Sequence, residues 1–302
     1  MGEAFEVPLT SLPEPRPSDS HFGDIAAGST ALPGGMPILA IMGDSHAALF
    51  GHGVRRPGIV KATYGTGSSL MTLTPLRINS SNGLSGTIAW STGDGVTCAI
   101  EGNITVSAQA AAFMAELLGV DGVSALTALA QSEADSNGVT FVPALAGLGA
   151  PHWNDWAKGA IEGMTLGTRP AHLARATFEA IALQIADVFW AMERDIGASL
   201  DALNADGGAS ANAFLMQLQA DVLDRPVRRG NVAEVGALGV AWMAFDAAKI
   251  SAPSNAVVNP WQTFRAAGNA DWRKALLLIW HAATARATQQ HRKNGNFAVQ
   301  MQ

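Results

Sequence analysis

One long amphipathic helix limits the folds open to this chain of 302 residues more than any other feature. Between His172 and Ile196 apolar side chains recur at steps of three and four residues, and Gly197 follows as a stop signal. Isolated helices are only marginally stable in water, and this one carries a wide apolar stripe that needs a large partner surface. We therefore expect it to lie in the core of a globular domain.

Strand and turn signals supply that partner surface. Two hairpins are predicted, one over residues 58–73 with a turn at residues 65–67 and one over residues 86–100 with a turn at residues 93–95, because both turns contain the glycines that tight turns require. An apolar run suggests a buried strand at Pro37–Met42 that ends just before Asp44. Further short strands are predicted at residues 139–142 and 203–206, and further helices at residues 105–118, 123–134, 212–223, 237–247 and 271–289. This order predicts an α/β fold with a mixed sheet flanked by helices.

The chain divides into three parts by composition. Residues 1–35 contain five prolines among serines and glycines, which predicts an irregular lead-in, interpreted as the end of a linker. Residues 36–288 contain all the periodic segments and form the predicted domain. Residues 289–302 are polar and are expected to be a frayed tail.

Charge and cysteine content exclude several classes of partner. The net charge of −6 provides no attraction to nucleic acids or to anionic membrane surfaces. The amino terminus is acidic and lacks the pattern of a secretory signal, and the sequence contains no apolar run of 18 residues. The single cysteine, Cys98, cannot form an intramolecular disulfide, so we expect a cytoplasmic protein.

Three glycine-rich or acidic segments are candidate sites, and each also has a plain structural interpretation. Asp44 is a candidate general base for a substrate hydroxyl, although it is equally suited to cap a helix. The turn Gly65-Thr66-Gly67 offers N–H groups to phosphate oxygens or is a simple hairpin turn. The Gly207-Gly208 turn allows a ligand to approach a helix start, or it is only a tight turn.

Histidine and serine patterns indicate no separate chemistry. His46, His52 and His152 show no metal-binding spacing and are interpreted as surface or core residues. No serine lies in the Gly-x-Ser-x-Gly pattern of a nucleophile elbow, which argues against a hydrolase. No metal ligand is predicted.

The order and spacing of several motifs together resemble the FGGY family of carbohydrate kinases. Residues 159–164, followed after seven residues by residues 172–179, fit the second family pattern at every constrained position. The resemblance covers about residues 10–250, the carboxyl-terminal half of such a kinase. The supporting motifs are Gly43-Asp44 with Ala47–Gly51, Tyr64–Gly67, Glu101-Gly102, and Asp206–Gly208 with Asn212 and Phe214–Gln217.

The resemblance implies one lobe of the actin-like, ribonuclease-H-like ATPase fold, with ATP and Mg²⁺ as cofactors and a small sugar or polyol as substrate. By position, Asp44 matches the catalytic base, and Asp44 and Ser45 match substrate contacts. Matches to nucleotide contacts are Gly65, Thr66, Gly67, Gly207, Gly208 and Asn212. The family's amino-terminal lobe, which opens with an Asp-x-Gly-Thr hairpin, has no counterpart here, so we expect the chain to be a fragment that is inactive alone and self-associates through the exposed lobe surface.

Two departures from glycerol kinases bear on these expectations. Ser45 stands where glycerol kinases have Gln, which makes glycerol doubtful as the substrate. Ala108 and Ala112 replace the family's nucleotide-contacting Gly and Gln, which suggests a locally different nucleotide grip. The alternative hypothesis is a non-catalytic nucleotide-binding or regulatory module of the same fold.

Overall fold

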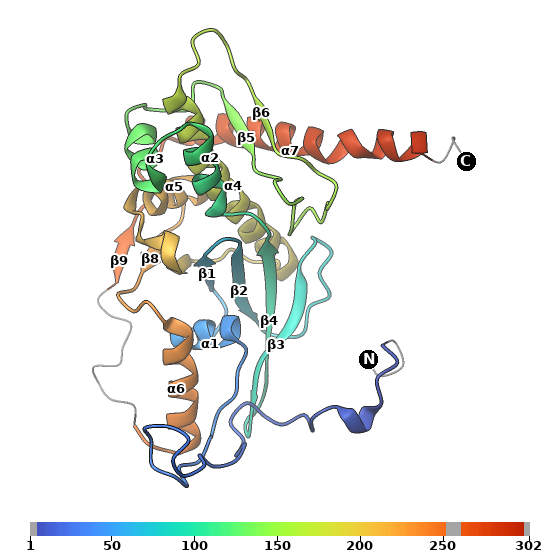
Figure 1. Ribbon diagram of the computed structural model, residues 1–302, viewed down its shortest axis with the longest axis vertical. Coiled ribbons are helices and arrows are strands. Elements are labelled where there is room, and N and C mark those ends of the chain that lie inside the picture. Colours follow the sequence, from blue (N-terminus) through green and yellow to red (C-terminus); the bar gives the residue numbers. More distant parts are fainter. Residues whose placement is uncertain (1–4, 252–260, 299–302) are drawn as a thin grey trace.

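A seven-stranded sheet in the order β3-β4-β2-β1-β7-β8-β9 forms the centre of the computed structural model, which describes residues 5–251 and 261–298. The pairs β1–β7 and β7–β8 are parallel, whereas all other neighbours are antiparallel. The predicted mixed sheet is therefore confirmed (Figure 1). Its strands are β1 (Ile59–Tyr64), β2 (Ser68–Thr74), β3 (Ser85–Thr92), β4 (Gly95–Ile104), β7 (Ala202–Asp206), β8 (Val227–Arg229) and β9 (Gln262–Phe264).

Both predicted hairpins are present. β1 pairs with β2 around residues 65–67, and β3 pairs with β4 around residues 93–94. Gly67 packs so closely against the end of β4 that an added Cβ would lie 2.4 Å from the carbonyl oxygen of Ile104. A side chain at that position would push the first hairpin away from β4.

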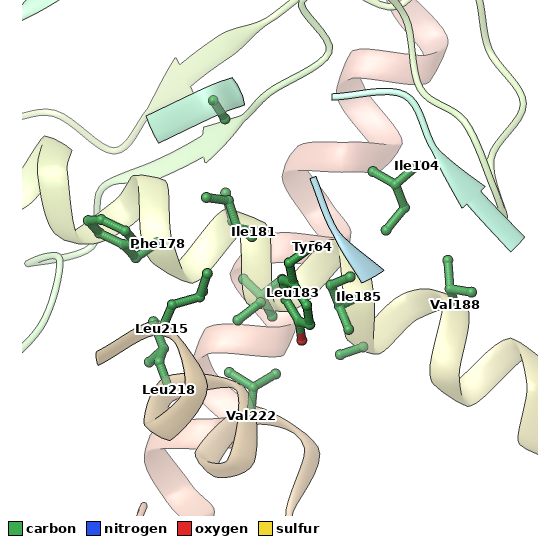
Figure 2. Close-up of a cluster of buried hydrophobic side chains, with 14 of the residues drawn as sticks. Tyr64, Ile104, Phe178, Ile181, Leu183, Ile185, Val188, Leu215, Leu218 and Val222 are labelled. Carbon is green, nitrogen blue, oxygen red and sulfur yellow. The ribbon is translucent and has the colours of Figure 1, made fainter. Parts of the chain in front are cut away.

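One face of the sheet is covered by the predicted long helix and its neighbours. α4 (Pro170–Ile196) ends at Gly197, whose φ of 71° is left-handed, as expected for a glycine stop. It packs against α2, α3 and α5. Figure 2 shows Phe178 and Ile181 of α4 near Leu215 of α5, and Tyr64 of β1 beside Leu183 of α4. The other helices of this layer are α2 (Gln109–Leu117), α3 (Gly122–Gln131) and α5 (Ala213–Leu223).

The opposite face is covered by α1 (Asp44–Gly51) and α6 (Val235–Ala247), which pack closely on each other. A Cβ on Gly239 of α6 would lie 1.8 Å from the carbonyl oxygen of Ala47, so only glycine permits this contact. A second apolar core fills the space between these helices and the sheet; its members include Leu49, Phe50, Met71, Leu73, Trp90 and Met243. The sheet thus lies between two helical layers.

A small sheet and a terminal helix complete the chain. β5 (Thr140–Val142) pairs with β6 (Ala160–Glu162), and α7 (Ala270–Ala298) runs past them. The strand at residues 139–142 and the terminal helix were both predicted, and the helix is longer than its sequence pattern indicated. Residues 299–302 of the predicted tail lie outside the described residues.

The strand predicted at Pro37–Met42 is wrong. Apart from one isolated bridge between Asp24 and Pro37, this segment makes its backbone hydrogen bonds with residues 18–23 of the lead-in and does not join the sheet. Ile38 and Ile41 remain exposed. The apolar run resembles a buried strand by composition alone, but its backbone pairs with the lead-in and not with the sheet.

Among the described residues, no single helix is both long and apolar enough to cross a membrane. Only α2 and α3 taken together reach the required length and apolarity, and they are bent by 83° relative to each other.

Candidate active site

A cleft of about 1120 Å³ lies where β1 and β7 end side by side, bordered by the first turn of α1, residues 229–234 and the start of α6. Ligands of open α/β sheets gather at this carboxyl edge of parallel strands. Of the predicted site residues, the cleft is lined by Asp44, Ser45, Gly207 and Gly208.

The floor of the cleft is a row of polar side chains that crosses four strands. Thr63 of β1 pairs with Ser69 of β2 on one side and with Asp206 of β7 on the other, and Ser69 pairs with Asn103 of β4. Directly paired residues present their side chains on the same face of a sheet. All four side chains therefore face α1, and all four line the cleft.

A second row lies one pleat deeper and is mostly buried. Lys61 pairs with Met71 and with Asn204, and Met71 pairs with Glu101. Lys61 has no solvent-exposed surface. Burial lowers the pKa of its ammonium group, while the charges of Asp206, Asp44 and Glu101 oppose that change.

Asp44 is the first residue of α1 and is exposed to the cleft. Its Oδ1 accepts a hydrogen bond of 2.6 Å from the backbone N–H of Ser45. The helix N-terminus favours a negative charge at this position. The capping role is filled by Gly43 without a side-chain bond, so the Asp44 carboxylate is available to a ligand.

Ser45 points its hydroxyl into the protein. It accepts a hydrogen bond of 2.8 Å from Lys61 Nζ and shares one of 2.7 Å with the Ser69 hydroxyl. Both partners lie on the sheet, beneath the first turn of α1.

Asp206 is a buried carboxylate at the centre of the cleft floor. Its Oδ2 accepts a hydrogen bond of 2.6 Å from His52 Nε2. Burial would raise the pKa of Asp206, but this hydrogen bond, the nearby charges of His52 and Lys61 and a hydrogen bond with Thr63 outweigh it and hold the pKa below its ordinary value. Nδ1 of His52 is buried without a hydrogen-bond partner.

The turn after β7 requires glycine at one position and is open at the next. Gly207 has a φ of 83°, and an added Cβ would lie 2.6 Å from the carbonyl oxygen of Tyr64 at the end of β1. Gly208 has nothing within 4 Å of that position, which leaves its backbone open to a ligand. Arg229 steadies the following turn, η2 (Gly208–Ala211), by donating to the carbonyl oxygens of Ser210 and Ala211.

The remaining predicted residues do not line the cleft. The turn Gly65-Thr66-Gly67 lies against the approach to α2, where the Thr66 carbonyl accepts from the N–H of Ser107. Asn212 caps α5, because its Oδ1 accepts from the N–H of Leu215 and its Nδ2 donates to Thr127 Oγ1. Their contacts with a nucleotide therefore stay predictions.

Lys61, Glu101, Asn103 and Arg229 were not predicted as site residues, and Asp206 and His52 were given no role in the site. Only Lys61 carried a usable signal, since a lysine in the middle of an apolar strand needs charged partners. The other side chains meet only through strand pairing and helix packing over long sequence separations.

Comparison with known proteins agrees with this geometry. The model of the FGGY family of carbohydrate kinases, C-terminal domain, matches residues 60–248. This chain belongs to the FGGY family of carbohydrate kinases. Relatives include an apulose kinase of Pectobacterium atrosepticum, 49% identical over 240 residues, and a glycerol kinase of Paraburkholderia phymatum, 41% identical over 290 residues. These alignments cover 79% and 94% of this FGGY chain, but only 48% and 58% of the two relatives.

Solved structures of FGGY kinases share the fold. A glycerol kinase of Plasmodium falciparum with ADP superimposes with a TM-score of 0.86 at 28% identity, covering 96% of this chain and 59% of that one. A xylulose kinase of Lactobacillus acidophilus gives a TM-score of 0.83 at 19% identity, which bears on the fold alone. The actin-like ATPase fold expected from the sequence is confirmed, and the chain spans about half the length of the relatives it matches.

Proposed function

We propose that this FGGY chain is the half of an ATP-dependent carbohydrate kinase that carries the catalytic base and part of the ATP site. The observation that carries the proposal is the shared cleft, in which the Asp44 carboxylate and the open Gly207-Gly208 turn lie at opposite borders of one polar floor. Phosphoryl transfer depends mainly on positioning and on charge stabilisation, and this cleft supplies both.

In this proposal Asp44 accepts the proton of the substrate hydroxyl as that oxygen attacks the γ-phosphorus of ATP. The bond between the γ-phosphorus and the bridging oxygen breaks, and ADP leaves with that oxygen. The Gly208 backbone and the start of η2 face the nucleotide, because this turn lines the cleft and leaves open space beside Gly208. The position of Asp44 in the first turn of α1 places its carboxylate at the border of the cleft.

Mg²⁺ fits this site only together with nucleotide phosphates. The described residues contain no cluster of three His, Cys, Asp or Glu side chains able to bind a metal by themselves. Mg²⁺ is usually held by one or two carboxylates plus substrate phosphates, and Asp44 and Asp206 are the carboxylates suited to that role. When bound, the ion neutralises charge that develops on the phosphoryl group.

The substrate is proposed to be a small ketose or polyol. The relatives named apulose kinase and glycerol kinase act, by their names, on molecules of this kind. Ser45 is shorter than the Gln of glycerol kinases and its hydroxyl points inward, which leaves more space beside Asp44. This space favours a substrate bulkier than glycerol, such as a branched ketose.

The decisive experiment measures ADP release with Mg-ATP by the chain joined to its amino-terminal half, against a panel of glycerol, erythritol, xylulose, ribulose and apulose. We expect turnover with at least one ketose above the rate without substrate. Tight ATP binding without turnover on any member would instead support a non-catalytic nucleotide-binding module.

The chain alone is expected to be inactive. Transition-state stabilisation in a two-lobed kinase is collected as both lobes close on the substrate, so one lobe loses most of it. Turnover by the isolated chain at a rate close to that of the complete protein would contradict this expectation.

A further inference from the structure

Lys61 lies beneath the floor of the cleft and has no role in the proposed chemistry. It is fully buried, whereas Lys158, Lys249 and Lys274 are all exposed. Removing an ammonium group from water costs several kcal/mol unless partners compensate for it. A lysine retained in the middle of β1 therefore needs a reason beyond packing.

Lys61 is connected through Ser45 to Asp44, the proposed base. Its Nζ donates to Ser45 Oγ over 2.8 Å, and the backbone N–H of Ser45 donates to Asp44 Oδ1 over 2.6 Å. The Ser69 hydroxyl, 2.7 Å from Ser45 Oγ, fixes the same group from β2. Two neighbouring strands thus hold the first turn of α1 at Ser45, one residue after Asp44.

The contacts from Lys61 through Ser45 form a tether to Asp44, and the charge of Lys61 also bears on the position of Asp44. The carboxylates of Asp44, Asp206 and Glu101 surround the ammonium group, and they lie on three different elements, α1, β7 and β4. Without the positive charge of Lys61, these three carboxylates would lose their shared counterion; His52 lies beside Asp206, and Arg229 borders the cleft. Their repulsion would move the exposed one, Asp44, because the other two are anchored on strands of the sheet.

We propose that Lys61 is a positioning residue that acts through Ser45 to hold the Asp44 carboxylate at the reacting position of the cleft. The inference rests on the proposed function, in which Asp44 is the base. It assigns Ser45 a role opposite to the one expected from its sequence position: its hydroxyl serves the protein and does not contact the substrate. The substrate-contacting surface of α1 is then formed by Asp44 and the residues after Ser45.

Kinetics of the complete protein test the first part. Lys61→Met should lower kcat about 100-fold while KM for ATP changes little, since displacing a catalytic group by about 1 Å has effects of this size. Ser45→Ala should also lower kcat, whereas Ser45→Thr, which keeps the hydroxyl, should retain most of the wild-type rate. Lys158→Met, at an exposed lysine, is the matched control and should behave as wild type.

A double-mutant cycle tests whether Lys61 acts through Ser45. The double variant Lys61→Met/Ser45→Ala should lose no more activity than Lys61→Met alone, because the two residues form one tether. If the losses in kcat of the two single variants multiplied in the double variant, Lys61 would not act through Ser45. If Ser45→Ala instead raised KM for the sugar and left kcat unchanged, Ser45 would be a substrate contact.

Hydrogen–deuterium exchange provides a readout independent of activity. In Lys61→Met, amides of residues 45–50 should exchange at least about tenfold faster, whereas amides of β7 and α4 should be unchanged because their ladders are untouched. Unchanged exchange in α1 would overturn the tether even if kcat fell. If the wild-type protein phosphorylates no substrate, the proposed function fails, while faster exchange would still establish that Lys61 holds the first turn of α1.

Discussion

The Asp44 carboxylate lines the cleft, is exposed and lies in the first turn of α1, which makes its removal a direct test of the proposed base. In the complete protein, Asp44→Asn should lower kcat at least about 100-fold, because general-base catalysis contributes that much. KM for ATP should stay nearly unchanged, since Asn keeps the shape of the side chain. Steady-state ADP release measures both constants.

The matched control is Asp94→Asn in the turn between β3 and β4, an exposed carboxylate that does not line the cleft. This variant should keep wild-type kcat. Normal turnover in Asp44→Asn would remove Asp44 from the role of base.

Two adjacent glycines offer a prediction about stability. Gly207→Ala places a methyl group 2.6 Å from the Tyr64 carbonyl oxygen and forces a left-handed φ on alanine, which should cost about 1–3 kcal/mol of unfolding free energy. Gly208→Ala meets open space and should change it by less than about 0.5 kcal/mol. Urea unfolding of both variants measures the difference, and equal stabilities would show that the two turns do not abut as described.

Single residues also mark the limit of what the sequence predicts about the site. Asp44, Gly207 and Gly208 were found because short local patterns surround them. Glu101 and Asn103 take their places in the cleft only through the register of β4 against β2, and no local signal encodes that register. The pairing of His52 with Asp206, 154 positions apart, depends on packing that only the folded chain defines.

At the scale of elements, one buried carboxylate holds α7 against the long helix. Asp187 of α4 accepts hydrogen bonds from Trp280 Nε1 over 2.7 Å, from His281 Nε2 over 3.2 Å and from His152 Nε2 over 3.3 Å. The hydrogen bond to Asp187 raises the pKa of His281, with burial and Arg194 acting against it. Burial would raise the pKa of Asp187, but its donors hold it below its ordinary value.

These shifts predict a pH window for the docking of α7. A histidine with a raised folded pKa stabilises the fold below its unfolded pKa of about 6.5, and this contribution is lost as the pH rises through the folded value. The Asp187 contribution is present above about pH 3.9 and is lost as the pH falls through its lower folded value. The contacts should therefore be strongest between about pH 4 and 6.5.

Thermal unfolding between pH 5.5 and 8.5 measures how this stabilisation is lost as the pH rises. The Tm of His281→Gln should fall less with rising pH than that of the wild type, by an amount that corresponds to under about 1 kcal/mol, because the ring is half exposed. Identical slopes in the wild type and in His281→Gln would rule out His281 as the titrating group.

Elements were predicted well where their signals are local. The long helix was recognised by its apolar period and by Gly197, and both hairpins by the glycines of their turns. The failure at Pro37–Met42 has the opposite cause, since an apolar run becomes a strand of a sheet only when its backbone pairs with that sheet. Here the run makes its backbone hydrogen bonds with residues 18–23 of the lead-in instead.

At the scale of the whole molecule, β3 is an edge strand of the large sheet and carries exposed apolar side chains. Ile88 on β3 is 56% exposed and Val96 on β4 is 61% exposed, and the lead-in adds Leu9 at 74%. Backbone pairing with the lead-in reaches β3 at Ser91. Exposed apolar edge strands favour pairing between chains.

We therefore expect the isolated chain to form concentration-dependent oligomers through this edge. Light scattering over a wide concentration range should show a mean mass that rises with concentration, and the double variant Ile88→Thr/Val96→Thr should shift that rise to higher concentration, because threonine keeps the strand propensity and reduces the apolar surface. Leu278→Thr removes an exposed apolar side chain from α7, away from this edge, and should leave the rise unchanged. A wild-type chain that remains monomeric throughout would show that the lead-in and β4 are enough to prevent pairing at this edge.

Joining the amino-terminal half should abolish self-association only if that half covers β3, so the same measurement on the complete protein tests whether this edge belongs to the interface between the two lobes.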